Sequence, residues 1–396
     1  MTHFAPLTKL CLSSRPGETS RLNWHLKLAA PPAPRIQRRP TVSDLPTVFP
    51  ADEFDPAKDA DALSDAFKGF GISVFRVGTK DDVIISIFTG RSCDQRRKIQ
   101  DIYNETYQKC LVDELHSELS GNYLQIMESM LDKPDQLRAK RIKKLIHTKV
   151  NLPGSLSTDV AVLEIIYPLT PAEINTLVIA YADAFQVNLI EDIDEKVDGD
   201  FKDTLKHILQ NGRNIEEPSP SQIQSDAQLL SKLSPAEWSP HHPAFMKIFL
   251  SSSVYLFYLF TVIRANESKT LLEVAKTETN EKYRDGFVVM VNAADGSRRY
   301  VADLLYQSMK GLGTQDDRLI YLILAHCEKD LGNIEEEFLN KYEDSLQNFI
   351  RGDTSGDFQK ALLALCGQET VPPIEKRGSV DSASPQGEEN IPVEQQ

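Results

Sequence analysis

An internal repeat constrains the fold of this 396-residue chain more than any other feature of its sequence. Three segments end in a glycine, any residue and an aromatic residue, and their glycines are Gly121, Gly199 and Gly356. The first interval is 199 − 121 = 78 residues and the second is 356 − 199 = 157, close to two further periods. Regular spacing of this length indicates copies of one structural unit. A fourth copy is expected in the second interval, where the segment 278–283 carries Glu281 in place of the glycine.

A second pattern precedes two of these anchors at a fixed distance. Gly78 lies 118 − 78 = 40 residues before Glu118, and Gly313 lies 353 − 313 = 40 residues before Asp353. Each of these two glycines is followed by a threonine that opens a helix. The loop alone could be an ordinary T-x-x-D helix cap. Its pairing with a carboxylate at the same distance, twice, indicates that one fold brings loop and carboxylate together in both copies.

This pairing suits a calcium ion. A glycine-rich turn can point several backbone carbonyls in one direction, and Ca²⁺ is bound by oxygen atoms at about 2.3–2.6 Å, often with a bidentate carboxylate. The sequence therefore predicts split sites in which a loop supplies carbonyl oxygens and a distant Asp or Glu supplies the carboxylate.

Helical periodicity begins at about residue 50, and strand alternation is nearly absent, so we expect an all-α fold. One stripe repeats about every four residues and consists of Ile334, Phe338, Tyr342 and Leu346. The most apolar window, 244–263, is interrupted by Lys247 and three serines. We interpret it as a buried helix and not as a membrane span.

Composition excludes several functional classes. A net charge of −14 argues against nucleic acid as a partner, because phosphate binding depends on Lys and Arg. Five scattered cysteines without CxxC spacing favour neither a disulfide framework nor a zinc site and fit a reducing cytosol. The N-terminal apolar run is too short for a signal peptide. Known nucleophile, zinc-protease, phosphate-loop and dinucleotide motifs are missing from the sequence, so an enzyme is not expected.

With these paired motifs the chain resembles the annexins, and the resemblance covers about residues 50 to 367. It implies four five-helix repeats that form a curved disc. The expected segments are repeat 1 at 50–132, repeat 2 at 133–212, a linker at 213–224, a divergent repeat 3 at 225–295 and repeat 4 at 296–367. The Pro-rich, basic segment 1–49 and the segment 368–396, rich in Pro, Glu and Ser, are expected to be disordered tails.

The resemblance also implies calcium-dependent binding to anionic phospholipid membranes of the phosphatidylserine kind. In repeat 4 the implied Ca²⁺ ligands are the carbonyls of Met309, Gly311 and Gly313 and the carboxylate of Asp353. These groups leave part of a six- to eight-fold shell open for water or a lipid phosphate oxygen. Leu312, at the loop tip, is the implied lipid contact.

Repeat 1 differs by a larger loop, because Gly78 follows Gly71 by 78 − 71 = 7 residues. Its expected Ca²⁺ ligands are Gly78 and Glu118, and its expected lipid contact is Phe70. In repeat 2, Lys196 replaces the carboxylate and a cation repels calcium, so we expect no site there.

Repeat 3 keeps an acid, Glu278, which lies 278 − 239 = 39 residues after Ser239, and we include it among the candidate metal ligands. Proline and serine replace the loop glycines and restrict the turn. Trp238, in the same loop, is a candidate lipid contact, with packing in the core as the alternative.

These features predict a cytoplasmic protein that joins the plasma membrane or vesicles peripherally when calcium rises. The alternative is a calcium-independent helical scaffold that acts through its tails, because repeats 2 and 3 depart from the pattern. Self-association on membranes and the proteins that bind the tails are left open.

Overall fold

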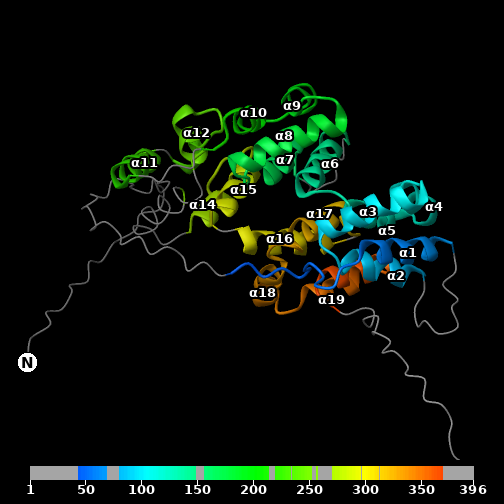
Figure 1. Cartoon of the computed structure of the whole chain (residues 1–396). Helices are drawn as coiled ribbons and strands as arrows, with labels where there is room; N and C mark the ends of the chain where they lie inside the picture. Colours follow the sequence, from blue (N-terminus) through cyan, green and yellow to red (C-terminus); the bar gives the residue numbers. More distant parts are fainter. Residues whose placement is uncertain are drawn as a thin grey trace, which may run out of the picture. The chain divides into compact units, whose positions relative to one another are not determined.

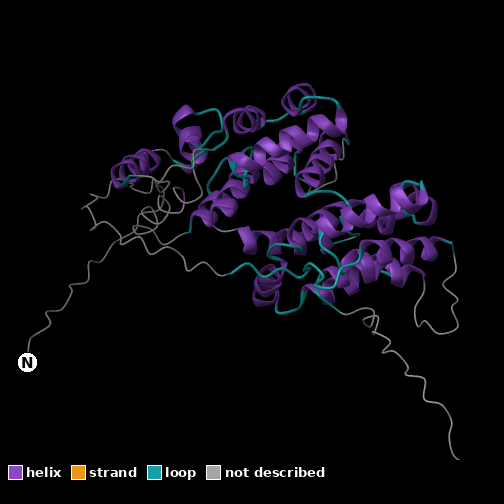
Figure 2. Ribbon diagram, in the orientation of Figure 1, coloured by secondary structure: helices purple, strands orange, loops and turns teal. Residues whose placement is uncertain are grey.

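The computed structural model describes residues 43–68, 80–148, 156–213, 219–232, 234–251, 256, 270–295, 297–311 and 313–368. Within these ranges the regular elements are helices and no β-strand is present (Figure 2). The predicted all-α fold is therefore confirmed for the described part of the chain.

Among the described residues, five helices lie in each of the segments expected as repeats 1, 2 and 4. Figure 1 shows the helices coloured along the chain. Repeat 1 holds α1 (Pro56–Phe67), α2 (Lys80–Thr89), α3 (Cys93–Tyr107), α4 (Leu111–Glu118) and α5 (Gly121–Ser129). Repeat 2 holds α6 (Pro134–His147), α7 (Thr158–Ile166), α8 (Pro171–Phe185), α9 (Leu189–Lys196) and α10 (Lys202–Asn211). Repeat 4 holds α16 (Ser297–Met309), α17 (Asp316–His326), α18 (Leu331–Tyr342), α19 (Leu346–Asp353) and α20 (Gly356–Leu365).

The segment expected as repeat 3 holds the 3₁₀-helix η1 (Pro235–Glu237), α12 (Pro243–Phe249), α14 (Leu271–Thr277) and α15 (Arg284–Asp295). Helix α11 (Pro220–Lys232) begins inside the range expected as a linker. Residues 252–255 and 257–269, which include most of the apolar window 244–263, lie outside the described residues. In the part that is described, no helix is long and apolar enough to cross a membrane.

Helix ends repeat with the period found in the sequence. Gln108, Gln186 and Glu343 follow α3, α8 and α18 with left-handed φ angles of 53°, 55° and 58°. Their spacings are 186 − 108 = 78 and 343 − 186 = 157, equal to those of the glycine anchors. Gly121 and Gly356 begin α5 and α20 with φ of 59° and 64°, a conformation that glycine adopts without strain. The repeats therefore share turn geometry as well as helix order.

Chain contacts divide the described residues into two compact units. The 1/4 unit consists of the described residues of 44–137 and 298–368, and the 2/3 unit consists of Ser43 and the described residues of 138–297. Repeats 1 and 4 are thus packed together although they lie at opposite ends of the repeat array.

The 1/4 unit is built by reciprocal contacts. Corresponding positions of repeats 1 and 4 differ by 356 − 121 = 235 from the Gly-Thr loop onward. Gln125 Nε2 donates to Asp317 Oδ1 at 2.7 Å, and Lys360 Nζ contacts Asp82 Oδ1 at 3.1 Å. Because 360 − 125 and 317 − 82 both equal 235, the same two positions are joined in both directions. Helix α5 therefore meets α17 as α20 meets α2, and the two repeats share one core.

Residues 44–48, which we call the N-terminal strap, pack against repeat 4. The amides of Thr47 and Val48 both donate to the carbonyl of Cys327, at 2.8 and 3.0 Å. The hydroxyl of Thr47 donates to the carbonyl of Leu365 at 2.6 Å, and Val48 is buried. The expectation of a disordered tail over 1–49 is therefore wrong for this strap, because its backbone groups have partners and its valine enters the core.

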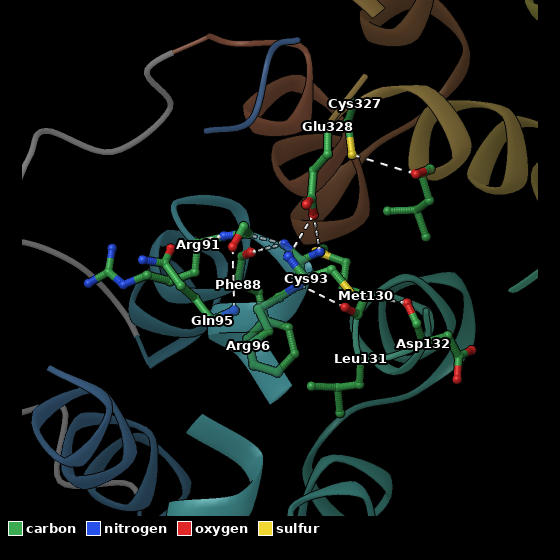
Figure 3. A network of polar contacts seen from close by, with 12 residues as sticks. Phe88, Arg91, Cys93, Gln95, Arg96, Met130, Leu131, Asp132, Cys327 and Glu328 are labelled. Carbon is green, nitrogen blue, oxygen red and sulfur yellow. Dashed lines mark hydrogen bonds and ion pairs between the residues drawn. The ribbon is translucent and has the colours of Figure 1, made fainter. Parts of the chain in front are cut away.

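Arg96 links repeats 1 and 4 inside the same unit (Figure 3). Its side chain is 4% exposed, and its guanidinium donates to Met130 O at 2.7 Å, Phe88 O at 3.0 Å and the carbonyl of Arg91. It also pairs with Glu328 Oε1 at 2.6 Å. The planar fork of arginine suits several acceptors at once, so one buried cation satisfies carbonyls near the ends of α2 and α5.

Candidate metal site

The loop between α16 and α17 has the backbone that the repeat 4 prediction requires. Gly311 and Gly313 have φ of 122° and 89°, in the left-handed region that favours glycine. A Cβ atom at either glycine would meet no neighbouring atom within 4 Å. Glycine is therefore required here by its backbone conformation and not by a lack of space for a side chain. Both glycines are exposed, while the side chain of Met309 is buried in the core.

Asp353 is the last residue of α19 and lies against this loop. Thr314 Oγ1 donates to the backbone carbonyl of Asp353 at 3.1 Å. The carboxylate atom Asp353 Oδ2 is buried and has no hydrogen-bond partner. A buried carboxylate oxygen without a partner is costly, and a bound cation would offset that cost. The donor set of loop carbonyls and one carboxylate therefore fits Ca²⁺.

Repeat 1 presents its carboxylate differently. Glu118 is the last residue of α4, as Asp353 is of α19. Glu118 Oε2 accepts from Lys80 Nζ at 3.0 Å, and Lys80 is the first residue of α2. Gly78 and Phe70 lie outside the described residues, as does Leu312 in repeat 4, so their predicted roles stay predictions.

Glu118 and Asp353 line one cavity of about 560 Å³ in the 1/4 unit. The ends of α4 and α19 and the starts of α2, α5, α17 and α20 surround it. Five carboxylates line it: Asp81, Glu118, Asp316, Asp353 and Asp357. Burial raises the pKa of Asp81, and the negative charge of Asp357 raises it further. The cavity therefore favours positive charge.

No group of three or more His, Cys, Asp or Glu side chains in the described ranges is arranged to hold a metal. The predicted site is of another kind, because it takes one carboxylate and completes the shell with backbone oxygens.

Repeats 2 and 3 keep fewer of the predicted calcium ligands than repeats 1 and 4. Lys196 stands at the end of α9 where the other repeats have an acid, and it contacts Glu195. Glu278 is half-buried at the end of α14. In the preceding loop, His241 Nε2 contacts Asp200 Oδ1 at 3.2 Å. A metal role for Glu278 stays a prediction.

Trp238, predicted as a lipid contact, is instead buried. Its side chain is 5% exposed, and its ring lies 5.4 Å from Phe245, 6.2 Å from Phe249 and 6.1 Å from Phe287, centroid to centroid. Such a cluster buries a large apolar area. The lipid-contact prediction is wrong in this structure because the ring serves the core of the 2/3 unit.

Together, the fold and the site define a class: all-α repeat proteins in which a Gly-Thr loop is joined to a distant carboxylate. The sequence profile described as Annexin matches residues 58–130 and 300–365. Human annexin A13 is 33% identical over 315 residues, which cover 79% of this chain and 95% of that protein. The structure of chicken annexin V matches with a TM-score of 0.72 at 30% identity, covering 82% of this chain and 99% of that one. The chain belongs to the annexin family.

Mouse annexin A6 is 32% identical over 330 residues, and this chain spans about half of it, 47% of its length. Annexins as a family are calcium-dependent membrane-binding proteins and are not enzymes, which confirms the prediction that this chain is not an enzyme. The prediction of the family is likewise confirmed.

Sequence reasoning missed Lys80. The residue after the Gly-Thr pair is Lys80 in repeat 1 and Gln315 in repeat 4, and 315 − 80 = 235. Comparing the two repeats at this position would have singled out the lysine as a neighbour of the predicted carboxylate.

Proposed function

We propose that this protein binds anionic phospholipid membranes in a calcium-dependent manner, chiefly through repeat 4. The observation that carries the proposal is the buried, unpartnered oxygen of Asp353 beside an exposed loop with two glycines in left-handed conformations. Asp353 would supply the carboxylate, and Met309, Gly311 and Gly313 would supply backbone carbonyls.

The electrostatics of the chain support this function. Its net charge of −14 opposes contact with a negative leaflet. A calcium ion that keeps open coordination positions bridges the protein and a lipid phosphate. The expected surface is a phosphatidylserine-containing membrane on its cytoplasmic side, where the surface potential is negative. We include Leu312 and Phe70 as apolar contacts at the interface, and Gly78, Glu118 and Glu278 as ligands of additional sites.

Co-sedimentation with vesicles tests the proposal. The full chain is mixed with phosphatidylserine/phosphatidylcholine vesicles or with phosphatidylcholine vesicles, in a calcium series and in chelator. We expect binding only to the anionic vesicles and only with calcium. Binding that persists in chelator would favour the calcium-independent scaffold and contradict the proposal.

Substitution of the carboxylate tests the site. Asp353→Asn keeps the shape of the side chain and removes its charge, so the calcium concentration for half-maximal vesicle binding should rise at least about tenfold. Glu336→Gln is the matched control, because it removes one negative charge from an exposed position of α18 in the same repeat. An unchanged calcium dependence in Asp353→Asn would show that the ligand assignment is wrong.

A further inference from the structure

Lys80 occupies the carboxylate that repeat 1 would offer to a cation. Its ammonium lies 3.0 Å from Glu118 Oε2, and the side chains of Lys80 and Glu118 are 36% and 30% exposed. Both residues line the shared acidic cavity. Among the described residues that line it, Lys80 is the one cationic side chain against five carboxylates.

The same place in repeat 4 carries no charge. Adding the repeat offset gives 80 + 235 = 315 and 118 + 235 = 353, so Gln315 and Asp353 correspond to Lys80 and Glu118. Gln315 is neutral and exposed, and Asp353 Oδ2 has no partner. The two carboxylates thus differ in their immediate neighbour: one is neutralised from within the protein and the other is not.

We propose that Lys80 is an internal competitor for the cation at Glu118, so that repeat 1 takes up calcium only at concentrations well above those that fill repeat 4. This inference rests on the proposed function and adds an order of filling to it. A calcium ion that takes both oxygens of Glu118 must displace the ammonium, and the two like charges repel each other at close range. Lys80 therefore sets the calcium threshold of repeat 1 without being a ligand.

Removing the lysine should lower that threshold. Lys80→Gln copies the repeat 4 residue and frees Glu118 while leaving its carboxylate in place. The lost ion pair is partly exposed and worth little by itself, but repulsion of the incoming ion is lost as well. The calcium dissociation constant at repeat 1 should fall about three- to tenfold.

Calorimetric calcium titration of the full chain without lipid isolates this effect. All proteins carry Asp353→Asn, which removes the repeat 4 carboxylate. Lys109→Gln is the matched control, because Lys109 Nζ pairs with Glu114 Oε1 at 2.8 Å on the same helix as Glu118. We expect tighter binding with Lys80→Gln, no change with Lys109→Gln, and loss of the gain when Glu118→Gln is added. Equal affinities for the Lys80 and Lys109 variants would overturn the inference.

The reverse exchange provides a second measurement. In a Glu118→Gln background, Gln315→Lys places an ammonium beside Asp353 and should weaken calcium binding about three- to tenfold. Circular dichroism checks that each variant is folded. If the unsubstituted protein binds calcium but neither exchange shifts affinity, only the role of Lys80 is overturned. If neither the unsubstituted protein nor any of the variants binds calcium, the proposed function and this inference are overturned together.

Discussion

Replacing Arg96 by methionine should destabilise the 1/4 unit by about 3–5 kcal/mol, the usual cost of breaking a buried ion pair by removing one partner. The methionine fills much of the space of the arginine stem but donates no hydrogen bonds. Glu328, 31% exposed, can recover part of its hydration. The carbonyls of Phe88 and Met130 lose a charged donor, at about 1.5–3 kcal/mol each. Together these two losses come to about 3–6 kcal/mol, which agrees with the expected destabilisation.

Urea unfolding of the full chain in chelator, followed by circular dichroism, measures this loss without calcium linkage. Arg97→Met is the matched control, because Arg97 makes one long contact, from Nη1 to Leu131 O at 3.4 Å. It should cost less than about 1 kcal/mol. Arg96→Lys should fall between the two, since an ammonium cannot reach several carbonyls at once. A loss in Arg96→Met below about 1 kcal/mol, or equal to that of Arg97→Met, would refute the reasoning.

Four further substitutions test the packing and turn geometry described above. Burial raises the pKa of Glu335 from 4.5 to about 7. The folded state thus holds this proton more tightly than the unfolded state, so stability falls as pH rises from 4.5 through 7. Between about pH 5 and pH 8 the unsubstituted protein should lose about 1–3 kcal/mol relative to Glu335→Gln, measured by urea unfolding at each pH. Gly199→Ala should cost at least about 2 kcal/mol in thermal unfolding, because φ is 139° and the new Cβ would lie 2.2 Å from the carboxylate of Asp159. Gly352→Ala, inside α19 with open space around it, should be neutral or slightly stabilising. Thr47→Val should cost about 1 kcal/mol in the same assay, because the strap loses its hydroxyl bond to the end of α20 and keeps its backbone bonds. Equal pH profiles for the Glu335 pair, equal melting of the two glycine variants, or no loss in Thr47→Val would contradict the respective argument.

Repetition made the fold predictable. The intervals between Gly121, Gly199 and Gly356 indicated copies of one unit, and the 40-residue pairing indicated that loop and carboxylate meet. Thr314 and Asp353 do lie together. These features are visible in sequence because glycine is chosen for a backbone conformation that other residues rarely adopt.

Other features were hidden for physical reasons. Gln108 and Glu343 adopt the same left-handed conformation without being glycine, so nothing in their identity marks the turn. Trp238 suits both an interface and a core, and only the position of the surrounding phenylalanines decides between them. Lys80 lies 38 residues from Glu118, and their contact arises from helix packing that no local pattern describes.

The pairing of the first and last repeats also affects how the chain is made. Repeat 1 leaves the ribosome first, but its partner begins 298 − 137 = 161 residues later. At about 5–20 residues per second, that interval lasts roughly 8–32 s, far longer than the time a helix needs to form. During this time the apolar face that α17 and α20 will cover stays in water. The nascent protein is therefore most exposed to aggregation while repeats 2 and 3 are being synthesised. The apolar face of repeat 1 is covered only when repeat 4 emerges.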